Sequence, residues 1–456
     1  MTTPAADPAH SSAGPTAYRV DARLIWAIAL PAMATNVATA LIGIGDMWIV
    51  GRLQDVAAQG AVDVGAKLFA LLFTVMNFLK TGTTGLVAQD RGADPRQAAT
   101  LIRALIVGLV LAVVLLLLKP LVVPFGISAL GAEGAVARAA RIYIDIRYWS
   151  APAFFANLAL LGLLVGRRQV RAALVIEVLY NLTNIGLGLL FVLALDLGIA
   201  GIAWSSLIAE YGKFIGTALF VMRGETVRHL ASTFTAGGAL AWARFRPLLA
   251  LNGDLFLRSL ILAVAMAALT RAGAGIGPVA LAANGIIFQL FIFSALLIDG
   301  FENAAQVLNG EAFGARDRQG FFTTMRAILW RGLGVAALLS LAFLILADPI
   351  LASFAATPAV ARFAQDHAIW LAVIPLAGVV SFTLDGVFVG ASWTRAMMVG
   401  MIGAAICYAL ALWLTQPLGN HGLWLSFTLF LLARAAFQAL QIPWLARRSF
   451  AASVAA

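Results

Sequence analysis

The sequence predicts an all-α integral membrane protein with twelve transmembrane helices in two pseudo-symmetric six-helix lobes. Three observations predict this fold class. The 456 residues are 62% hydrophobic and only 11% charged, whereas a soluble chain carries about a quarter charged residues. The apolar residues form runs of the length that crosses a bilayer, roughly 20 residues for each helix. The two halves of the chain also share a set of matching residues. A single large soluble core is therefore excluded.

Apolar runs of roughly 20 or more residues define the predicted helices, and charged residues or Gly and Pro separate one run from the next. Twelve such runs are present, an even number, which is consistent with both termini lying on the same side of the membrane. The predicted spans are 22–50, 60–89, 99–124, 137–163, 169–194, 198–222, 244–271, 278–309, 323–350, 363–389, 396–416 and 422–445.

The basic residues are concentrated in alternate loops, and this pattern accounts for the net charge of +10 without a nucleic-acid partner. One set of loops holds Arg-rich segments such as Arg167-Arg168 and Arg447-Arg448, whereas the opposite set holds few basic residues. Because cytoplasmic loops carry the excess of Lys and Arg, we expect both termini in the cytoplasm. The expected location is a bacterial-type plasma (inner) membrane, with a disordered cytoplasmic tail over residues 1–21 and a second tail over 447–456.

The two halves of the chain form an internal repeat. Because six helices separate the copies, the repeats run parallel and are related by an axis along the membrane normal. Two such lobes can rock about a shared interface, which indicates a transporter that works by alternating access. A channel or an intramembrane enzyme does not need this duplication. The matching pairs are Gly92 with Gly314 at a spacing of 222, Gly166 with Gly390 at 224, and Gly198 with Gly419 at 221.

The repeat sets the expected domain boundaries. The N-lobe covers residues 22–222 and the C-lobe covers residues 244–446. A cytoplasmic linker over 223–243 joins the lobes, and its Ser and Gly residues are typical of a loop.

Asp46 is the most informative single residue, because it lies within the apolar run 34–50 without a basic residue in helical reach. A carboxylate at membrane depth is costly and usually faces a cavity where it has a function. Loss of its charge on protonation can bias the packing of the lobes. The alternative is a structural hydrogen bond to a neighbouring helix. The repeat mate of Asp46 is Ala268, so the acid belongs to the N-lobe alone.

Other polar residues lie within predicted spans. Asn184, in span 169–194, can face Asp46 across the N-lobe, although amide side chains also serve as packing contacts between helices. Asp254 and Arg258 are four residues apart in one helix, a spacing that allows a self-neutralising pair. A substrate-binding role is the alternative for both residues.

Asp299 and Asp385 each precede a glycine. An Asp-Gly step can mark a local break in a helix, where the carboxylate accepts the freed backbone amides, and a cavity role is again the alternative. Lys80 and Glu302 occupy matching repeat positions at a spacing of 222, so we expect them to cap equivalent helices of the two lobes near the cytoplasmic end.

Several function classes have no sequence support. The chain contains no Walker A phosphate loop, no HExxH and no GxSxG motif, so ATP-driven transport and hydrolysis are not expected. The single cysteine and the four scattered histidines do not form a metal-ligand pattern. We therefore expect no enzyme activity, cofactor or metal. The energy for transport must come from an ion gradient or from the substrate itself.

Several segments together resemble the multidrug and toxic compound extrusion (MATE) family, in the branch named for the DNA-damage-inducible protein F. The resemblance extends over the first ten predicted helices, and the internal repeat continues the pattern to the last. The segments that carry the resemblance are Ala29-Leu30-Pro31 with Gly43-Ile44-Gly45-Asp46, Phe78 to Gln89, Asn252-Gly253-Asp254 with Arg258, Asp299-Gly300-Phe301, and Leu384-Asp385-Gly386-Val387-Phe388-Val389-Gly390.

The resemblance implies efflux of amphiphilic, often cationic small molecules in exchange for H⁺ or Na⁺. It also implies that Asp46 is the cation-coupling acid, accompanied by Asn184 and by the hydroxyl of Ser206. The family often has an Asp four residues after this Asn, where the present chain has Gly188. Without that second carboxylate, H⁺ coupling is favoured over a dehydrated Na⁺ site. The expected partners are the substrates and membrane lipid, and the expected state is a monomer.

Two alternatives remain open from the sequence. A flippase for lipid-linked saccharides, in the same superfamily, would need a cationic cavity for pyrophosphate, for which Lys67, Lys80 and Lys213 are candidates. A more remote alternative is an intramembrane enzyme acting on lipid, which would need a nucleophile or a metal constellation.

Overall fold

The structure is a computed structural model that describes residues 22–51, 56–223, 241–355 and 357–451. Side chains of some helical residues, including residues 40–48, lie outside that description. The expected tail 1–21, residues 452–456 of the expected tail 447–456, and most of the expected linker lie outside it too. All of the elements in the described ranges are helical.

The helices of the N-terminal half correspond to the first six predicted spans. Proline favours the start of two of these helices, since Pro95 of α4 and Pro152 of α6 lie in the first turn, where a backbone amide is not needed. The bounds are α1 Ala22–Gly51, α2 Val56–Met76, α3 Phe78–Gln89, α4 Asp94–Ala129, α5 Gly134–Arg147, η1 Tyr148–Ser150, α6 Ala151–Gly166, α7 Val170–Leu189, η2 Leu190–Ala194 and α8 Gly198–Val221.

The helices of the C-terminal half correspond to the other six predicted spans. Asp317 caps α12 by accepting the Gly320 amide at 2.8 Å, and Thr357 caps α13 by accepting the Val360 amide at 3.3 Å. The bounds are α10 Trp242–Ile276, α11 Pro278–Gly314, α12 Arg318–Phe354, α13 Pro358–Asp366, α14 Ile369–Gly390, α15 Thr394–Leu414, η3 Gln416–Leu418 and α16 Gly419–Ala451.

Some predicted spans are interrupted in the structure. The span predicted over 60–89 divides at Asn77 into α2 and α3, and the span over 137–163 contains the 3₁₀ turn η1. The last helix continues to Ala451, so residues 447–451 are helical rather than part of a tail. Among the described residues, ten helical segments are long and apolar enough to cross a membrane. The pair α2–α3 and α8 supply the two remaining predicted spans.

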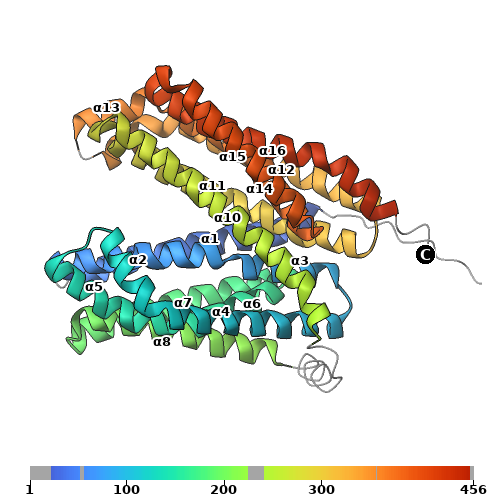
Figure 1. The fold of residues 1–456 in the computed structure, drawn as a ribbon, viewed down its shortest axis with the longest axis horizontal. Helices are drawn as coiled ribbons and strands as arrows, with labels where there is room; N and C mark the ends of the chain where they lie inside the picture. The colour runs from blue at the N-terminus through green and yellow to red at the C-terminus, as the bar shows by residue number, and fades with distance from the viewer. Residues whose placement is uncertain (1–21, 52–55, 224–240, 356, 452–456) are drawn as a thin grey trace, which may run out of the picture.

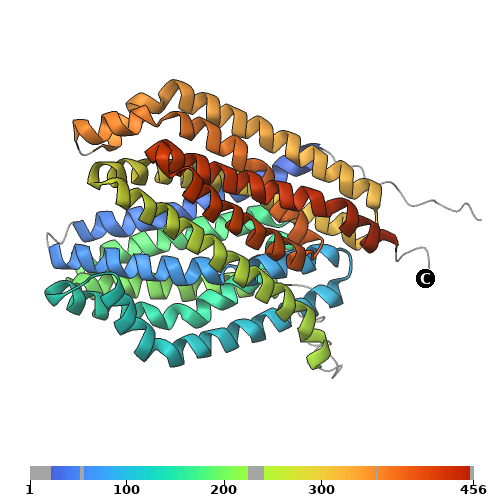
Figure 2. The same ribbon diagram turned by 45° about the horizontal axis from the view of Figure 1, so that its top comes forward.

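The helices form two groups, α1–α8 and α10–α16, which lie side by side in both ribbon views (Figure 1, Figure 2). Helices α1 and α3 of the first group contact α11 of the second, and α3 also contacts α14. Within its own group α11 packs mainly on α14 and α12. Four helices, α1, α3, α11 and α14, therefore build most of the interface between the lobes.

The internal repeat is visible in the backbone. Gly198 and Gly419, which begin α8 and α16, both have positive φ, at 54° and 57°. Arg168 and Ser392 also share positive φ, at 62° and 56°, in the turns after α6 and α14. Positive φ is uncommon for residues other than glycine. Its recurrence at a spacing of 224 shows that both halves make the same turn.

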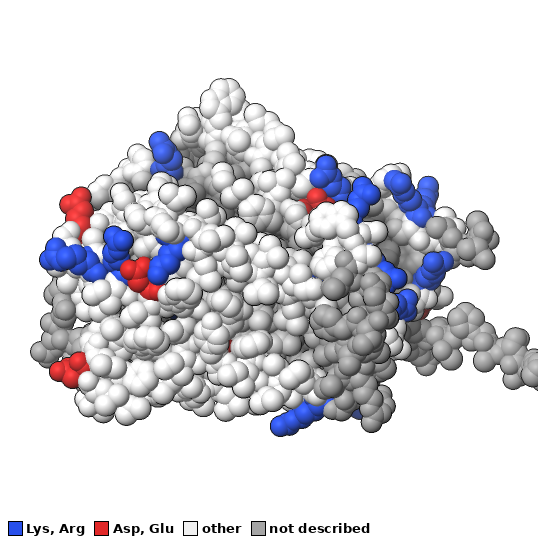
Figure 3. Space-filling model, turned by 60° about the horizontal axis from the view of Figure 1, so that its bottom comes forward, with Lys and Arg blue, Asp and Glu red and all other residues white. Residues whose placement is uncertain are grey.

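The outer surface suits a bilayer. Figure 3 shows a wide band without charged side chains, with Lys, Arg, Asp and Glu displaced toward the two ends. Large apolar side chains are exposed on the helices, for example Leu117 of α4 at 73% and Leu440 of α16 at 77%. Exposed apolar surface of this extent is typical of contact with lipid rather than water.

Candidate coupling and substrate site

The N-lobe contains a buried polar cluster between α7 and α8. The Oδ1 atom of Asn184 accepts hydrogen bonds from the Oγ atoms of Ser205, at 3.1 Å, and Ser206, at 3.4 Å. All three residues are buried. The structure thus places Asn184 and Ser206 together, and it adds Ser205, which sequence reasoning did not select.

Asp46 belongs to α1, one turn before Ile49, but its side chain lies outside the described residues. Ile49 is fully buried, and its Cδ1 atom would be 2.8 Å from a Cβ atom placed on Gly188. The same Cβ would lie 3.5 Å from the Ser205 Oγ. Ile49 therefore fills the space beside Gly188 that a second carboxylate would need.

A second charged network lies in the same lobe. Lys213 of α8 forms an ion pair with Glu177 of α7 at 2.7 Å, and both side chains are at most 9% exposed. Thr39 of α1 donates to the other Glu177 oxygen at 3.2 Å. The Lys213 ammonium also lies 4.6 Å from the centre of the Tyr180 ring. A hollow of about 600 Å³ opens between α7 and α8 beside Lys213.

Sequence reasoning missed Glu177 and Glu210 as buried acids. Glu210 is 7% exposed and accepts from Asn157 Nδ2 at 2.7 Å. Both acids lie within predicted spans, so the rule that selected Asp46 applies equally to them. The set of candidate acids selected from the sequence was therefore incomplete.

The C-lobe centres on Asp385 of α14, which is 1% exposed. Its carboxylate accepts from Arg258 of α10, from Arg434 Nη2 of α16 at 2.6 Å, and from Gln438 Nε2 at 2.5 Å. The Arg434 guanidinium is also stacked 5.3 Å from the centre of the Phe382 ring. One carboxylate thus serves as the shared counter-ion of two buried guanidinium groups, each of which would be costly to bury without a partner.

The predicted pair between Asp254 and Arg258 is wrong. Arg258 pairs with Asp385, and Asp254 pairs instead with Arg395 of α15 at 3.3 Å. The Thr394 hydroxyl also lies 3.3 Å from the Asp254 carboxylate. The two residues share a helix, but each finds a partner on a different neighbouring helix, which helical spacing alone does not reveal.

The predicted helix breaks at the Asp-Gly steps are also wrong. Helices α11 and α14 continue through Asp299-Gly300 and Asp385-Gly386. A Cβ on Gly300 would lie 2.7 Å from the Ala29 carbonyl oxygen of α1, and one on Gly386 would collide with the Glu302 carbonyl oxygen of α11. These glycines therefore allow close helix packing.

Lys80 and Glu302 are not helix caps, since Lys80 is the third residue of α3, whose N-cap is Asn77, and Glu302 lies well within α11. Lys80, Asp299 and Glu302 are partly exposed, and none has an ion-pair partner among the described residues. A cavity of about 20 Å³ lies beside Lys80, with Thr35, Asn36 and Asn303 in its lining. That volume holds about one water molecule, so this part of the interface is closed to a larger ligand.

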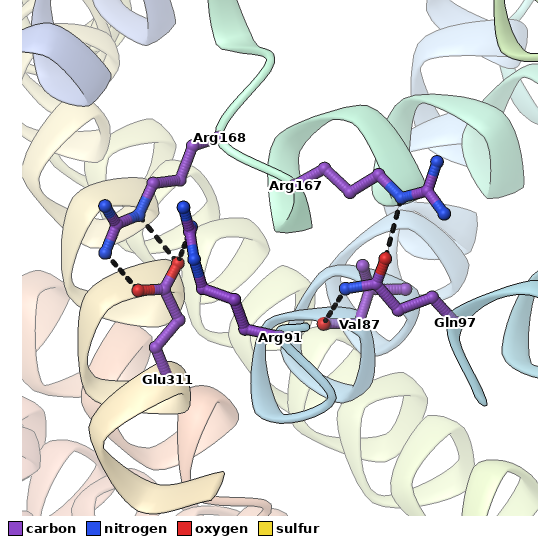
Figure 4. A network of polar contacts seen from close by, with 6 residues as sticks. All are labelled: Val87, Arg91, Gln97, Arg167, Arg168 and Glu311. Atoms are coloured by element: carbon purple, nitrogen blue, oxygen red, sulfur yellow. Dashed lines mark hydrogen bonds and ion pairs between the residues drawn. The ribbon is translucent and has the colours of Figure 1, made fainter. Parts of the chain in front are cut away.

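The arginine-rich end holds a polar network that crosses the lobes (Figure 4). Glu311 of α11 accepts from Arg91 and Arg168, both from turns of the N-lobe. Arg167 points the other way and donates to Gln97 at 2.7 Å, and Gln97 donates to the Val87 carbonyl at 3.1 Å (Figure 4).

The neighbouring Asp90, in the turn after α3, has a raised pKa. Burial of its carboxyl group is the main cause, and it is opposed by Arg96, which lies 3.2 Å away.

These features define a polytopic membrane transporter of two repeated lobes. A family model for MatE matches residues 31–190 and again residues 255–414, so the same model fits both halves at a spacing of 224. The chain belongs to the multidrug and toxic compound extrusion family, a family of transporters rather than enzymes. The resemblance inferred from the sequence and the twelve-helix, two-lobe fold are thereby confirmed.

Curated relatives support this assignment. The chain is 36% identical to the DNA damage-inducible protein F of Escherichia coli (strain K12) over 416 residues, which is 90% of each chain. It is 30% identical to Protein DETOXIFICATION 43 of Arabidopsis thaliana, over 74% of this chain and 62% of the relative. It is also 27% identical to a probable multidrug resistance protein NorM of Mesorhizobium japonicum, over 96% of both.

Solved structures share the fold at 18% sequence identity. One is a MATE protein in the bent conformation, with a TM-score of 0.83 over 94% of this chain and 97% of that one. Another is the outward-facing conformation of a multidrug resistance MATE family transporter of the MOP superfamily, also at 0.83, over 96% and 99%.

Proposed function

We propose that the protein is an H⁺-coupled antiporter that exports amphiphilic or cationic small molecules by alternating access, with Asp46, Asn184 and Ser206 as its coupling site. The observation that carries the proposal is the buried cluster of Asn184 with Ser205 and Ser206, since Ser205 borders the point where Gly188 meets Ile49 of α1, one turn after Asp46. An acid at membrane depth beside neutral polar groups can take up and release a proton.

Proton coupling is favoured over sodium coupling by the packing at Gly188. A dehydrated Na⁺ ion needs several oxygen ligands, and a carboxylate at position 188 would add charged oxygens to those of Asp46 and Asn184. The Ile49 side chain occupies that space instead, at 2.8 Å from a Cβ placed on Gly188. A single carboxylate with amide and hydroxyl neighbours suits a proton better.

The acids at the lobe interface support a cationic cargo. Asp299 and Glu302 are partly exposed and have no ion-pair partner among the described residues. When the lobes separate, these carboxylates can face a positively charged substrate. The NorM relative, described as a probable multidrug resistance protein, is consistent with amphiphilic drugs as cargo.

The flippase alternative receives less support. Lys67 pairs with Asp63 at 2.7 Å, and Lys213 pairs with Glu177 at 2.7 Å. Only Lys80 of the three candidate lysines is without an ion-pair partner among the described residues. A pyrophosphate group would require several cations that are not already neutralised.

The test is efflux of a fluorescent cationic dye from vesicles that contain purified protein, with the H⁺ and Na⁺ gradients set independently. We expect efflux to follow the H⁺ gradient alone. The Asp46→Asn variant should lose gradient-driven efflux while still folding, because its side chain cannot exchange a proton. Asp63→Asn is the matched control, since Asp63 forms an exposed pair with Lys67 within one helix, and it should retain efflux.

Two results would contradict the proposal. One is efflux that requires Na⁺ and survives collapse of the H⁺ gradient. The other is full H⁺-driven efflux by Asp46→Asn. Vectorial movement of a lipid-linked saccharide with no dye efflux would favour the flippase instead.

A further inference from the structure

Glu311 joins the two lobes at the arginine-rich end of the molecule (Figure 4). Its side chain is 2% exposed, although it carries a charge. Arg168 donates from Nε to the Oε1 atom at 2.7 Å and pairs through Nη2 with the second oxygen, while Arg91 pairs with Oε1. Glu311 belongs to the C-lobe and both arginines belong to the N-lobe, so the ion pairs cross between the bodies that must separate.

The internal repeat places a neutral counterpart beside this ionic contact. Gln89 is the repeat mate of Glu311 at a spacing of 222, and Ser392 is the mate of Arg168 at 224. Gln89 of the N-lobe donates to Ser392 Oγ at 2.8 Å and to the Gly390 carbonyl at 2.7 Å, both in the C-lobe. The two contacts are therefore related by the pseudo-symmetry, with one charged and one neutral.

The point midway between these contacts is tightly packed. Ala88 and Gly310, which are themselves repeat mates, meet there, because a Cβ on Gly310 would lie 3.0 Å from the Ala88 Cβ. A Cβ on the adjacent Gly314 would collide with the Gln89 carbonyl oxygen. The lobes thus touch backbone to backbone between the two polar contacts, and this end of the interface is closed.

We propose that Glu311, Arg168 and Arg91 form an ionic latch that holds the lobes closed at the arginine-rich end, and that its opening admits substrate there. The proposal rests on the alternating-access function proposed above. Two guanidinium groups on one buried carboxylate make a contact that cannot loosen gradually, since partial separation would leave the carboxylate buried without its cations. The latch opens only when the lobes part far enough to admit water.

The neutral contact explains why the latch is reversible. Its hydrogen bonds through Gln89 cost less to exchange for water than those of a buried carboxylate. A second ionic contact at that position would bias the equilibrium further toward closure. The asymmetry between the two halves of the repeat therefore sets the balance between the closed and open states.

The test is a spin-label distance measurement between Arg223→Cys of the N-lobe and Gln319→Cys of the C-lobe, both exposed at this end, in a Cys407→Ser background. Purified full-length protein in lipid nanodiscs is used without substrate. We expect Glu311→Gln to raise the ratio of the long-distance population to the short-distance population by about tenfold. Glu133→Gln, an exposed acid in the loop between α4 and α5, is the control and should leave the distribution unchanged.

Two further variants test whether the ionic contact itself causes the change in the distance distribution. Glu311→Arg combined with both Arg91→Glu and Arg168→Glu should restore the short distance, because the charges of all three residues are exchanged across the same contact. Gln89→Glu combined with Ser392→Arg should build a second latch, increase the short-distance population and slow dye efflux. Position 392 has the same positive φ as Arg168, so an arginine is tolerated there.

An unchanged distance distribution in Glu311→Gln would overturn the latch. If Glu311→Gln fails to fold, the variant with Gln89→Glu and Ser392→Arg tests the proposal in its place. An unchanged short-distance population in that variant would then overturn the latch. The distances are measured without an ion gradient or substrate. A shift of distances without H⁺-coupled efflux would therefore retain the latch and reject only the proposed coupling.

Discussion

At the scale of single residues, the buried charges differ mainly in their partners. Asp385 and Asp254 lie in the same lobe, and each binds arginine. The Asp385 carboxylate and Arg434 are each 1% exposed, whereas Arg395, the partner of Asp254, is 76% exposed. Removal of Asp385 leaves two buried guanidinium groups without their carboxylate, whereas removal of Asp254 leaves a cation that water already solvates.

We predict that Asp385→Asn lowers the free energy of unfolding by about 3–5 kcal/mol, the cost of breaking a buried ion pair. Asp254→Asn should lower it by less than about 1 kcal/mol, as for a solvent-exposed pair. Thermal unfolding of the purified variants in one detergent measures both. Equal losses in the two variants would show that burial of the partner does not control stability here.

At the scale of helices, glycine determines how closely α11 approaches its neighbours. Gly300 faces α1, Gly310 faces α3, and Gly386 of α14 faces the backbone of α11. Without a Cβ atom these residues let one helix backbone touch another, as is common in membrane proteins. The Asp-Gly steps look like helix breaks in the sequence, but their glycines serve this packing.

We predict that Gly386→Ala destabilises the protein by about 1–3 kcal/mol or more, because the new methyl group collides with the Glu302 carbonyl oxygen. Gly334→Ala, within α12, is the matched control, since a Cβ there meets no atom within 4 Å. It should stabilise the helix by up to about 1 kcal/mol. The yield of monodisperse protein and its melting temperature measure the difference. A Gly386→Ala protein as stable as the control would refute this packing argument.

The helices themselves could be predicted, but their interruptions could not. Hydropathy places each span, because a bilayer requires a long apolar run whatever surrounds it. The division at Asn77 and the 3₁₀ turn at Tyr148–Ser150 lie within such runs. Packing against neighbouring helices decides where a span bends, and that information is spread over distant parts of the chain.

At the scale of the whole molecule, a group of arginines marks one end of the helical bundle. Arg91 and Arg168 both contact Glu311, and Phe450 in the last turn of α16 packs on Phe313, two residues further along α11, so these arginines and the end of α16 lie at the same end of the molecule. We propose that this end is cytoplasmic, that the lobes cover residues 22–222 and 244–446, and that a single chain is the transport unit.

We predict that green fluorescent protein fused after Ala456 is fluorescent in bacterial cells, because it folds in the cytoplasm and fails to fold when exported unfolded. Alkaline phosphatase at the same position should be inactive for the opposite reason. Active phosphatase together with a dark fluorescent fusion would place the C-terminus outside and reverse the orientation.

The sequence by itself determined the class, the twelve spans and the repeat, and only its resemblance to the MATE family grouped Asn184 with Ser206. The spans and the repeat follow from local rules, since apolar length and residue spacing act within a helix or between its copies. Only the tertiary structure decided the partners: Arg258 with Asp385, Lys213 with Glu177, and Glu311 with two arginines of the other lobe. The physical reason is that a buried charge takes the partner nearest in space, and helix packing determines which one that is.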